Sequence, residues 1–232
     1  YAGWGARLRS TGAADKTGFW VAVLLVALWG SAAVLLALNI PIIRLLEGYG
    51  SWNPANLLLV VTLIRYDQLA REIAKLEDAI RNEADPETRR ALNAAYGRQL
   101  QRMAADFPER RHLVRPTMFG NTIRAFERYA DVVYGLDSIQ AWGRLLAVVP
   151  ADHRSALGQA KAAVDLWVNL WLAGVATVLL WLGLAAYGQA APQPWLPVLA
   201  AAFALVAALG ARRSAGLWGI LVKGAFDLYR GD

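Results

Sequence analysis

The sequence contains no cysteine and only two histidines, His112 and His153, which lie far apart in the chain. Without cysteine the chain forms no disulfide and offers neither a thiolate nucleophile nor a thiolate ligand. The histidines match no metal-binding spacing such as H-E-x-x-H, so we expect surface or capping roles and no metal site. The P-loop, G-x-G-x-x-G and G-x-S-x-G motifs are also missing. We therefore predict neither a catalytic residue nor a cofactor.

Ionisable side chains are missing from two long stretches of the chain. Residues 166–211 form a run of 46 positions, and residues 17–43 a run of 27 positions, without Asp, Glu, Lys, Arg or His. A helix needs about 20 apolar residues to cross a bilayer, so the longer run holds two crossings and the shorter run holds one. Backbone groups in lipid must form hydrogen bonds within their own segment, which makes each crossing a helix.

The sequence thus predicts an all-α integral membrane protein with three transmembrane helices and a helical cytoplasmic domain. Residues 54–64 are apolar but span only about 16 Å as a helix, so a fourth short or re-entrant segment stays open as an alternative. The expected parts are an N-terminal flank (1–17), a first transmembrane helix (18–44), a turn with an interfacial or re-entrant segment (45–64), a helical cytoplasmic domain (65–161), a transmembrane hairpin (162–211) and an amphipathic interfacial helix (212–232).

Basic residues predict the orientation of the hairpin. Lys and Arg favour the cytoplasmic side, and they flank both ends of the hairpin but are absent from its turn at 188–194. We expect a multi-pass protein of the bacterial inner membrane, with residues 65–161 and the C-terminus in the cytoplasm. The net charge of +6 fits basic cytoplasmic loops better than a nucleic-acid surface, so we predict no nucleic-acid partner.

Special residues concentrate between residues 115 and 142. Gly120 is expected to supply an unusual backbone angle and Asn121 to cap a helix at 122–133. The simplest interpretation is a structured turn that packs the domain. The alternative is a binding pocket lined by four polar side chains. The candidate binding or structural residues of this region are Arg115, Thr117, Gly120, Asn121, Glu127 and Asp137.

Three short motifs and one tryptophan follow one another along this part of the chain: Leu46-Glu47-Gly48-Tyr49, then Pro116-Thr117-Met118-Phe119-Gly120-Asn121, then Tyr134-Gly135-Leu136-Asp137, and last Trp142. This pattern resembles uncharacterised bacterial integral membrane proteins with a P-T-x-x-G-N segment, a Y-G-x-D segment and a downstream Trp. The resemblance covers roughly residues 45–170. It implies a membrane location and no assigned activity, so no catalytic role is carried over.

Two polar residues, Asp165 and Asn169, lie one helical turn apart where the second crossing begins. Polar groups at such positions often mark ion paths or contacts between helices, although Asp165 can also be hydrated or paired with a cation. Aromatic side chains near the ends of apolar runs are expected to anchor the helices at the lipid interface. These anchors are Trp20, Trp195, Trp218 and Tyr229.

Three crossings are few for a self-contained transporter built from inverted repeats. We therefore expect a non-catalytic accessory or scaffold subunit, whose partners are the lipid bilayer and either further copies of itself or proteins of a larger membrane complex. One alternative is a homo-oligomeric pore with Asp165, Asn169 and Asn39 facing its axis. A second alternative is an enzyme at the inner leaflet that uses Glu127 or Asp137 with Arg115.

Overall fold

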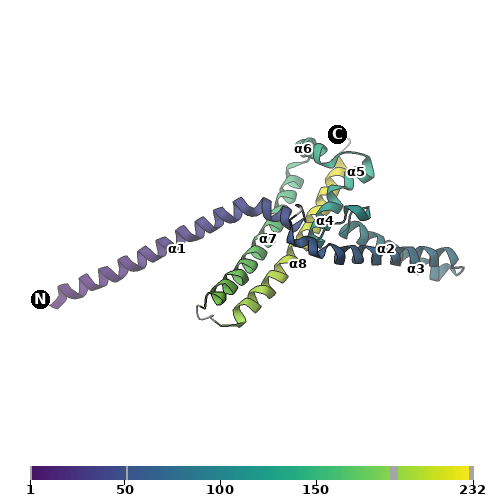
Figure 1. The fold of residues 1–232 in the computed structure, drawn as a ribbon. Helices are drawn as coiled ribbons and strands as arrows, with labels where there is room; N and C mark the ends of the chain where they lie inside the picture. Colours follow the sequence, from purple (N-terminus) through teal and green to yellow (C-terminus); the bar gives the residue numbers. More distant parts are fainter. Residues whose placement is uncertain (1, 51, 189–192, 230–232) are drawn as a thin grey trace. The chain divides into compact units, whose positions relative to one another are not determined.

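The computed structural model describes residues 2–50, 52–188 and 193–229, with side-chain surroundings from Gly18 onward apart from Ala27 and Leu36. Within these ranges the chain is helical and contains no strand, which confirms the all-α prediction (Figure 1). The chain divides into two units, residues 1–41 and 42–232, and each is described on its own. The helices are α1 (Ala2–Leu46), η1 (Pro54–Leu58), α2 (Leu59–Asn82), α3 (Pro86–Asp106), η2 (Arg111–Leu113), α4 (Met118–Glu127), α5 (Tyr129–Tyr134), α6 (Ser138–Val148), α7 (Ala151–Ala186) and α8 (Trp195–Tyr229).

Three of these helices are long and apolar enough to cross a bilayer, as expected from the two charge-free runs. The segment Gly18–Leu35 belongs to α1, and the other two helices are α7 and α8. Both α7 and α8 extend well beyond the charge-free run. We call residues 166–186 and 195–211 the apex half of this helix pair, and residues 151–165 and 212–229 its head half.

Small residues bring α7 and α8 close together in the apex half. A β-carbon placed on Gly174 would lie 2.9 Å from the β-carbon of Ala204 and 3.1 Å from the carbonyl oxygen of Ala200. Ala207 is fully buried, whereas the neighbouring Ala208 is only half-buried. These small residues therefore pack the two helices against each other within the chain, because glycine and alanine permit a close approach of the backbones.

The outward surface of the apex half consists of large apolar side chains. Leu180 is 66% exposed on α7 and Val198 is 66% exposed on α8. A soluble protein rarely exposes an apolar surface of this extent. The other exposed side chains of the two helices include Leu166, Leu179, Leu182, Leu199, Phe203, Leu205, Val206 and Leu209.

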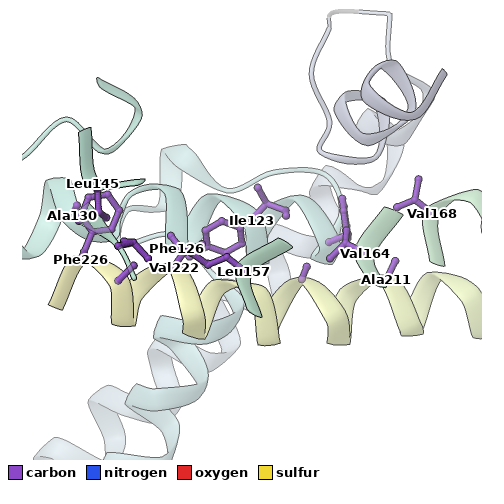
Figure 2. Close-up of a cluster of buried hydrophobic side chains, with 14 of the residues drawn as sticks. Ile123, Phe126, Ala130, Leu145, Leu157, Val164, Val168, Ala211, Val222 and Phe226 are labelled. Atoms are coloured by element: carbon purple, nitrogen blue, oxygen red, sulfur yellow. The ribbon is translucent and has the colours of Figure 1, made fainter. Parts of the chain in front are cut away.

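The main core lies around the head half. Figure 2 shows a row of buried side chains along α8, from Phe226 beside Ala130 and Leu145 at one end to Val168 near the other. The core receives side chains from α4, α5, α6, α7 and the last turns of α1. Each buried leucine or phenylalanine contributes about 1.5–3 kcal/mol, so this row supplies most of the apolar stabilisation of the head.

The C-terminal residues differ from the prediction of a separate interfacial helix at 212–232. Residues 212–229 continue α8 without a break, and Val222, Ala225 and Phe226 are buried against other helices. Arg212 lies within this continuous helix. Its guanidinium forms an ion pair with the Asp106 carboxylate at 2.8 Å. Part of the apolar surface of this segment is therefore covered by protein, while Leu217, Ile220 and Leu228 remain exposed.

Local sequence features set where several of the helices begin and end. The Asp85 carboxylate accepts a hydrogen bond from the Thr88 amide at 2.8 Å and starts α3, and Asn53 caps η1. Gly135 ends α5 with φ +66°, a left-handed angle that glycine adopts without strain. The helix predicted at 122–133 is instead two helices, α4 and α5, which meet at Arg128.

Helices α2 and α3 pack against each other as a hairpin, with Leu69 and Ile73 of α2 in a small core at its base (Figure 1). A small core of Tyr66, Leu69, Phe107 and Val114 holds the base of the hairpin. No residue of α3 within the described chain is buried, so the outer part of the hairpin depends on few contacts.

Candidate functional site

The sequence motifs at residues 46–49 and 115–121 meet in one compact junction. The chain leaves α1 through Gly48, whose φ of +84° lies in the left-handed region. A β-carbon at Gly48 would lie 2.3 Å from the Cδ atom of Pro116, so both the backbone angle and the close contact require glycine. The two motifs that the resemblance grouped by sequence are therefore neighbours in space.

A second glycine closes the junction from the other side. A β-carbon on Gly120 would lie 2.5 Å from the carbonyl oxygen of Glu47 and 2.8 Å from its Cα atom. The predicted reason for Gly120, an unusual backbone angle, is wrong: Gly120 lies within the first turn of α4 and has no positive φ. Its function is to let the first turn of α4 touch the backbone that follows α1.

Thr117 links the two segments through its hydroxyl group. The hydroxyl donates a hydrogen bond to the carbonyl oxygen of Leu46 and accepts one from the Gly120 amide at 2.9 Å. Thr117 is thus the N-cap of α4, in place of the predicted cap Asn121. The sequence alone could not separate these two candidates, because both residue types cap helices well.

Asn121 is buried and uses its whole side chain to hold the turn. Its Nδ2 donates to the carbonyl oxygens of Arg115 and Thr117, both at 2.9 Å, and its Oδ1 accepts from the Arg115 amide at 2.6 Å. The Thr62 hydroxyl donates to the same Arg115 carbonyl oxygen at 2.9 Å and so ties α2 to the turn. With its amide satisfied inside the protein, Asn121 has a structural role here.

A group of charges surrounds the junction. The Arg115 guanidinium lies 4.2 Å from the centroid of the Tyr49 ring, a cation–π geometry. Burial and the nearby Glu127 carboxylate raise the pKa of Glu47 to about 7, while Arg115 and Arg44 oppose the shift. Burial also raises the pKa of Glu127, against the attraction of Arg124 at 3.5 Å.

The four polar side chains of the predicted pocket do not gather around one cavity. Arg115 and Asn121 form the turn itself, as described above. Glu127 lines a cavity between α4, α6 and α8. Asp137 caps α6, where its Oδ1 accepts hydrogen bonds from two backbone amides at 3.0 and 3.1 Å, and it lines a different cavity beside Tyr229. The junction is therefore a packed turn, as the simpler interpretation expects.

The two polar residues at the start of the second crossing have different environments. The Asp165 carboxylate lies 2.8 Å from the Lys161 ammonium, one turn earlier in α7. The Asn169 Oδ1 atom is buried and has no hydrogen-bond partner within the described part of the chain. A buried carbonyl oxygen without a partner is costly, so Asn169 is the stronger candidate for a contact with a ligand or a second protein.

The predicted interface anchors also separate into two pairs. Trp20 and Trp195 have exposed indole rings, as an anchor requires. Trp218 instead packs edge-on against Phe126, with ring centroids 5.0 Å apart, and Tyr229 packs against His153 at 5.6 Å. Trp218 and Tyr229 are therefore parts of the protein core and its border.

Sequence reasoning missed two groups of side chains. The Asp227 carboxylate accepts hydrogen bonds from the hydroxyl groups of Tyr129, at 2.7 Å, and Tyr134. The second group is the set of aromatic residues around Glu127. Trp218, Val222 and Phe226 recur every four residues and so mark one apolar face of a helix. The sequence does not show that other helices of the chain cover this face, so the prediction places it against lipid.

No protein-family model, curated protein or solved structure matches this chain. Within the described residues no group of three or more side chains is arranged to hold a metal ion. The function is therefore argued from the geometry alone.

Proposed function

We propose that the chain is a multi-pass protein of the bacterial inner membrane that acts as a non-catalytic accessory or scaffold subunit. The observation that carries this proposal is the contrast between the two halves of α7 and α8. Their apex half exposes large apolar side chains such as Leu180 and Val198 along an uninterrupted charge-free stretch. In the head half α8 buries Val222 and Phe226 in a protein core, although Leu217, Ile220 and Leu228 are exposed there. Lipid is the solvent that suits such an apex half.

The orientation follows from charge. Arg212 and Arg213 lie at the head end of the charge-free run, beside Lys161 on the paired helix, and the turn at 188–194 carries no basic residue. With the positive end inside, the head lies in the cytoplasm and the turn lies outside.

A short apolar surface extends the lipid contact along the head. Trp52, Leu57, Val60 and Ile64 are exposed, while Thr62 on the opposite side of α2 is buried. This one-sided pattern supports the interfacial segment proposed for residues 45–64.

The case for a scaffold rests on what the junction and the helix pair do chemically. Asn121 and Thr117 spend their polar groups on backbone contacts that hold the helices in place. Gly174 and Ala204 close the space between α7 and α8, which leaves no water path through the pair itself. The exposed hairpin of α2 and α3 is then the surface offered to copies of the chain or to other subunits.

Cysteine labelling tests the membrane location directly, because the chain has no cysteine of its own. We expect Gln193→Cys to react with a membrane-impermeant maleimide on intact cells, and Ala84→Cys, between α2 and α3, to react only after the membrane is opened. Reaction of Ala84→Cys on intact cells would contradict the orientation.

Purification in a gentle detergent, followed by native mass measurement, tests the scaffold role. We expect a homo-oligomer or a complex with other membrane proteins. The pore alternative, favoured only by Asn169, predicts a closed ring and ion flux in liposomes that Asn169→Leu abolishes. A monomer without partners or flux would leave neither proposal standing.

A further inference from the structure

A cavity of about 190 Å³ lies between α4, α6 and α8, beside the core of the head. Since a water molecule occupies about 30 Å³ of liquid, the cavity has room for a group of several heavy atoms. The exposed Ile139 side chain lines one edge, so the cavity opens at the surface. The other side chains that define its character are Phe126, Glu127, Ser138, Trp142, Trp218 and Phe226.

The wall is aromatic on several sides. Phe126 and Trp218 form an edge-to-face pair with centroids 5.0 Å apart, and Trp142 and Phe226 form a tilted pair at 6.0 Å. Three different helices supply the four rings. Indole and phenyl faces carry negative charge density, so a group of rings around a small space attracts a cation.

Glu127 is the only ionisable residue that lines this cavity. Its carboxylate is about one-third exposed and lies 3.5 Å from the Arg124 guanidinium, which does not line the cavity. Arg124 and Arg115 both attract this carboxylate, yet the part of the side chain that stays exposed is open to a cation in the cavity. Burial raises the pKa of Glu127, while Arg124 and Arg115 oppose the shift.

Ser138 gives an independent sign that a polar ligand group belongs here. Its Oγ atom is buried and has no hydrogen-bond partner within the described chain. A buried hydroxyl without a partner costs free energy, so a hydroxyl, phosphate or carbonyl group of a ligand would relieve it.

We propose that this cavity binds the ammonium head of an amine ligand, with aromatic rings from Trp142 and Trp218 around the cation, Glu127 as its counter-ion and Ser138 as a partner for a polar group nearby. Aromatic residues with one carboxylate are the combination that recognises quaternary ammonium groups. The shared chemistry is a choline- or ethanolamine-like head, either in a free solute or on a lipid.

Titration calorimetry of the full chain in a non-ionic detergent tests the proposal. The probes are choline, tetramethylammonium and 3,3-dimethyl-1-butanol, which has the shape of choline but no charge. We expect choline to bind at least tenfold more tightly than the uncharged alcohol. We also expect choline to exceed tetramethylammonium, and Ser138→Ala to remove that difference.

Variants separate the site from general effects on the protein. Glu127→Gln and Trp142→Leu are each expected to weaken choline binding at least tenfold. The control is Trp52→Leu, which changes a tryptophan that is 98% exposed and is expected to leave binding unchanged. Circular dichroism checks that each variant keeps its helix content, and the conservative Glu127→Gln keeps the test decisive if Trp142→Leu does not fold. Equal binding of choline and the uncharged alcohol, or no loss in Glu127→Gln, would overturn the proposal.

Nanodiscs distinguish the two sources of the ligand. If the ligand is a lipid, native mass spectra will show phosphatidylcholine or phosphatidylethanolamine retained over phosphatidylglycerol, and added choline will displace it. If the ligand is a free solute, choline will bind without such retention. The calorimetry needs no bilayer, so its outcome is independent of the proposed membrane location.

Discussion

Helices α7 and α8 lie side by side along their length, yet their outward surfaces differ between the two halves. In the apex half Leu180 and Phe203 point away from the protein, and small residues such as Gly174 face the partner helix. In the head half Val222 and Phe226 are buried, and Lys223 and Asp227 lie toward the surface. The head half therefore packs one apolar face of α8 into a protein core and carries charged side chains, although Leu217 and Ile220 stay exposed there.

The comparison teaches that apolar content alone does not locate the membrane boundary. Both halves are rich in leucine, valine and alanine. What distinguishes them is that the head half buries Val222 and Phe226 in a protein core, whereas the large apolar side chains of the apex half, such as Leu180 and Val198, lie mainly on its outward surface. An outward surface of that kind suits lipid better than water.

The largest expected effect is the removal of a phenyl ring from each half. Phe226→Ala should lower the free energy of unfolding by about 3–5 kcal/mol, because it leaves a cavity in the head core. Phe203→Ala removes the same ring from an exposed position, where detergent or lipid fills the space, so we expect about 0.5 kcal/mol. Thermal unfolding in detergent, followed by circular dichroism, measures both. Equal losses would break the distinction between the halves.

A charge in each half gives the next largest contrast. Leu180→Arg should cost about 2–3 kcal/mol of membrane insertion, because the guanidinium enters the apolar region. Leu217→Arg changes a similarly exposed leucine of the head half and should have little effect. The amount of protein in the membrane fraction of expressing cells is the measurement. Normal insertion of Leu180→Arg would argue against lipid contact at that position.

Close packing of the apex half predicts a smaller effect. Gly174→Leu should force α7 and α8 apart and destabilise the pair by about 1–3 kcal/mol. The reason is that a β-carbon added at this position would lie only 2.9 Å from the β-carbon of Ala204. Gly183→Leu is the matched control, because open space surrounds that position in the same helix. Loss of thermal stability in both variants alike would mean that glycine is required for some other reason.

The smallest expected effect is a dependence of stability on pH at the junction. Glu47 has a pKa of about 7 in the folded chain, above its ordinary value of 4.5, so the folded state holds the proton more tightly than the unfolded state. Stability is then highest below about pH 4.5 and falls as the pH rises to about 7, by on the order of 1 kcal/mol after solvent screening. Glu47→Gln should flatten this part of the curve of melting temperature against pH. An unchanged curve would assign the dependence to another group.

Much of the helical framework could be predicted from the sequence because its signals are local. Charge-free runs identify the long apolar helices, Asp85-Pro86 starts α3, and Gly135 ends α5. These signals depend on the neighbours of each residue in the chain and therefore need no knowledge of the fold.

The remaining features depend on contacts between distant segments. Gly120 is required by the Glu47 backbone, more than 70 positions earlier in the chain, and no local pattern reveals that approach. The face of Trp218 and Phe226 was assigned to lipid because periodicity shows that a face is apolar and does not show what covers it. The candidate ammonium cavity was missed for the same reason, since its walls come from three helices.

Spin labels give the most direct test of the proposed passage from lipid to water near Arg212. The chain has no cysteine, so a single cysteine introduced at Leu180, Val198 or Leu217 carries the only nitroxide label. Electron paramagnetic resonance in liposomes then measures how often each label collides with oxygen and with a water-soluble nickel complex. We predict that the labels at Leu180 and Val198 collide mainly with oxygen, which concentrates in lipid, and that the label at Leu217 collides mainly with nickel. Preferential collision with nickel at Leu180 and Val198 would contradict the account.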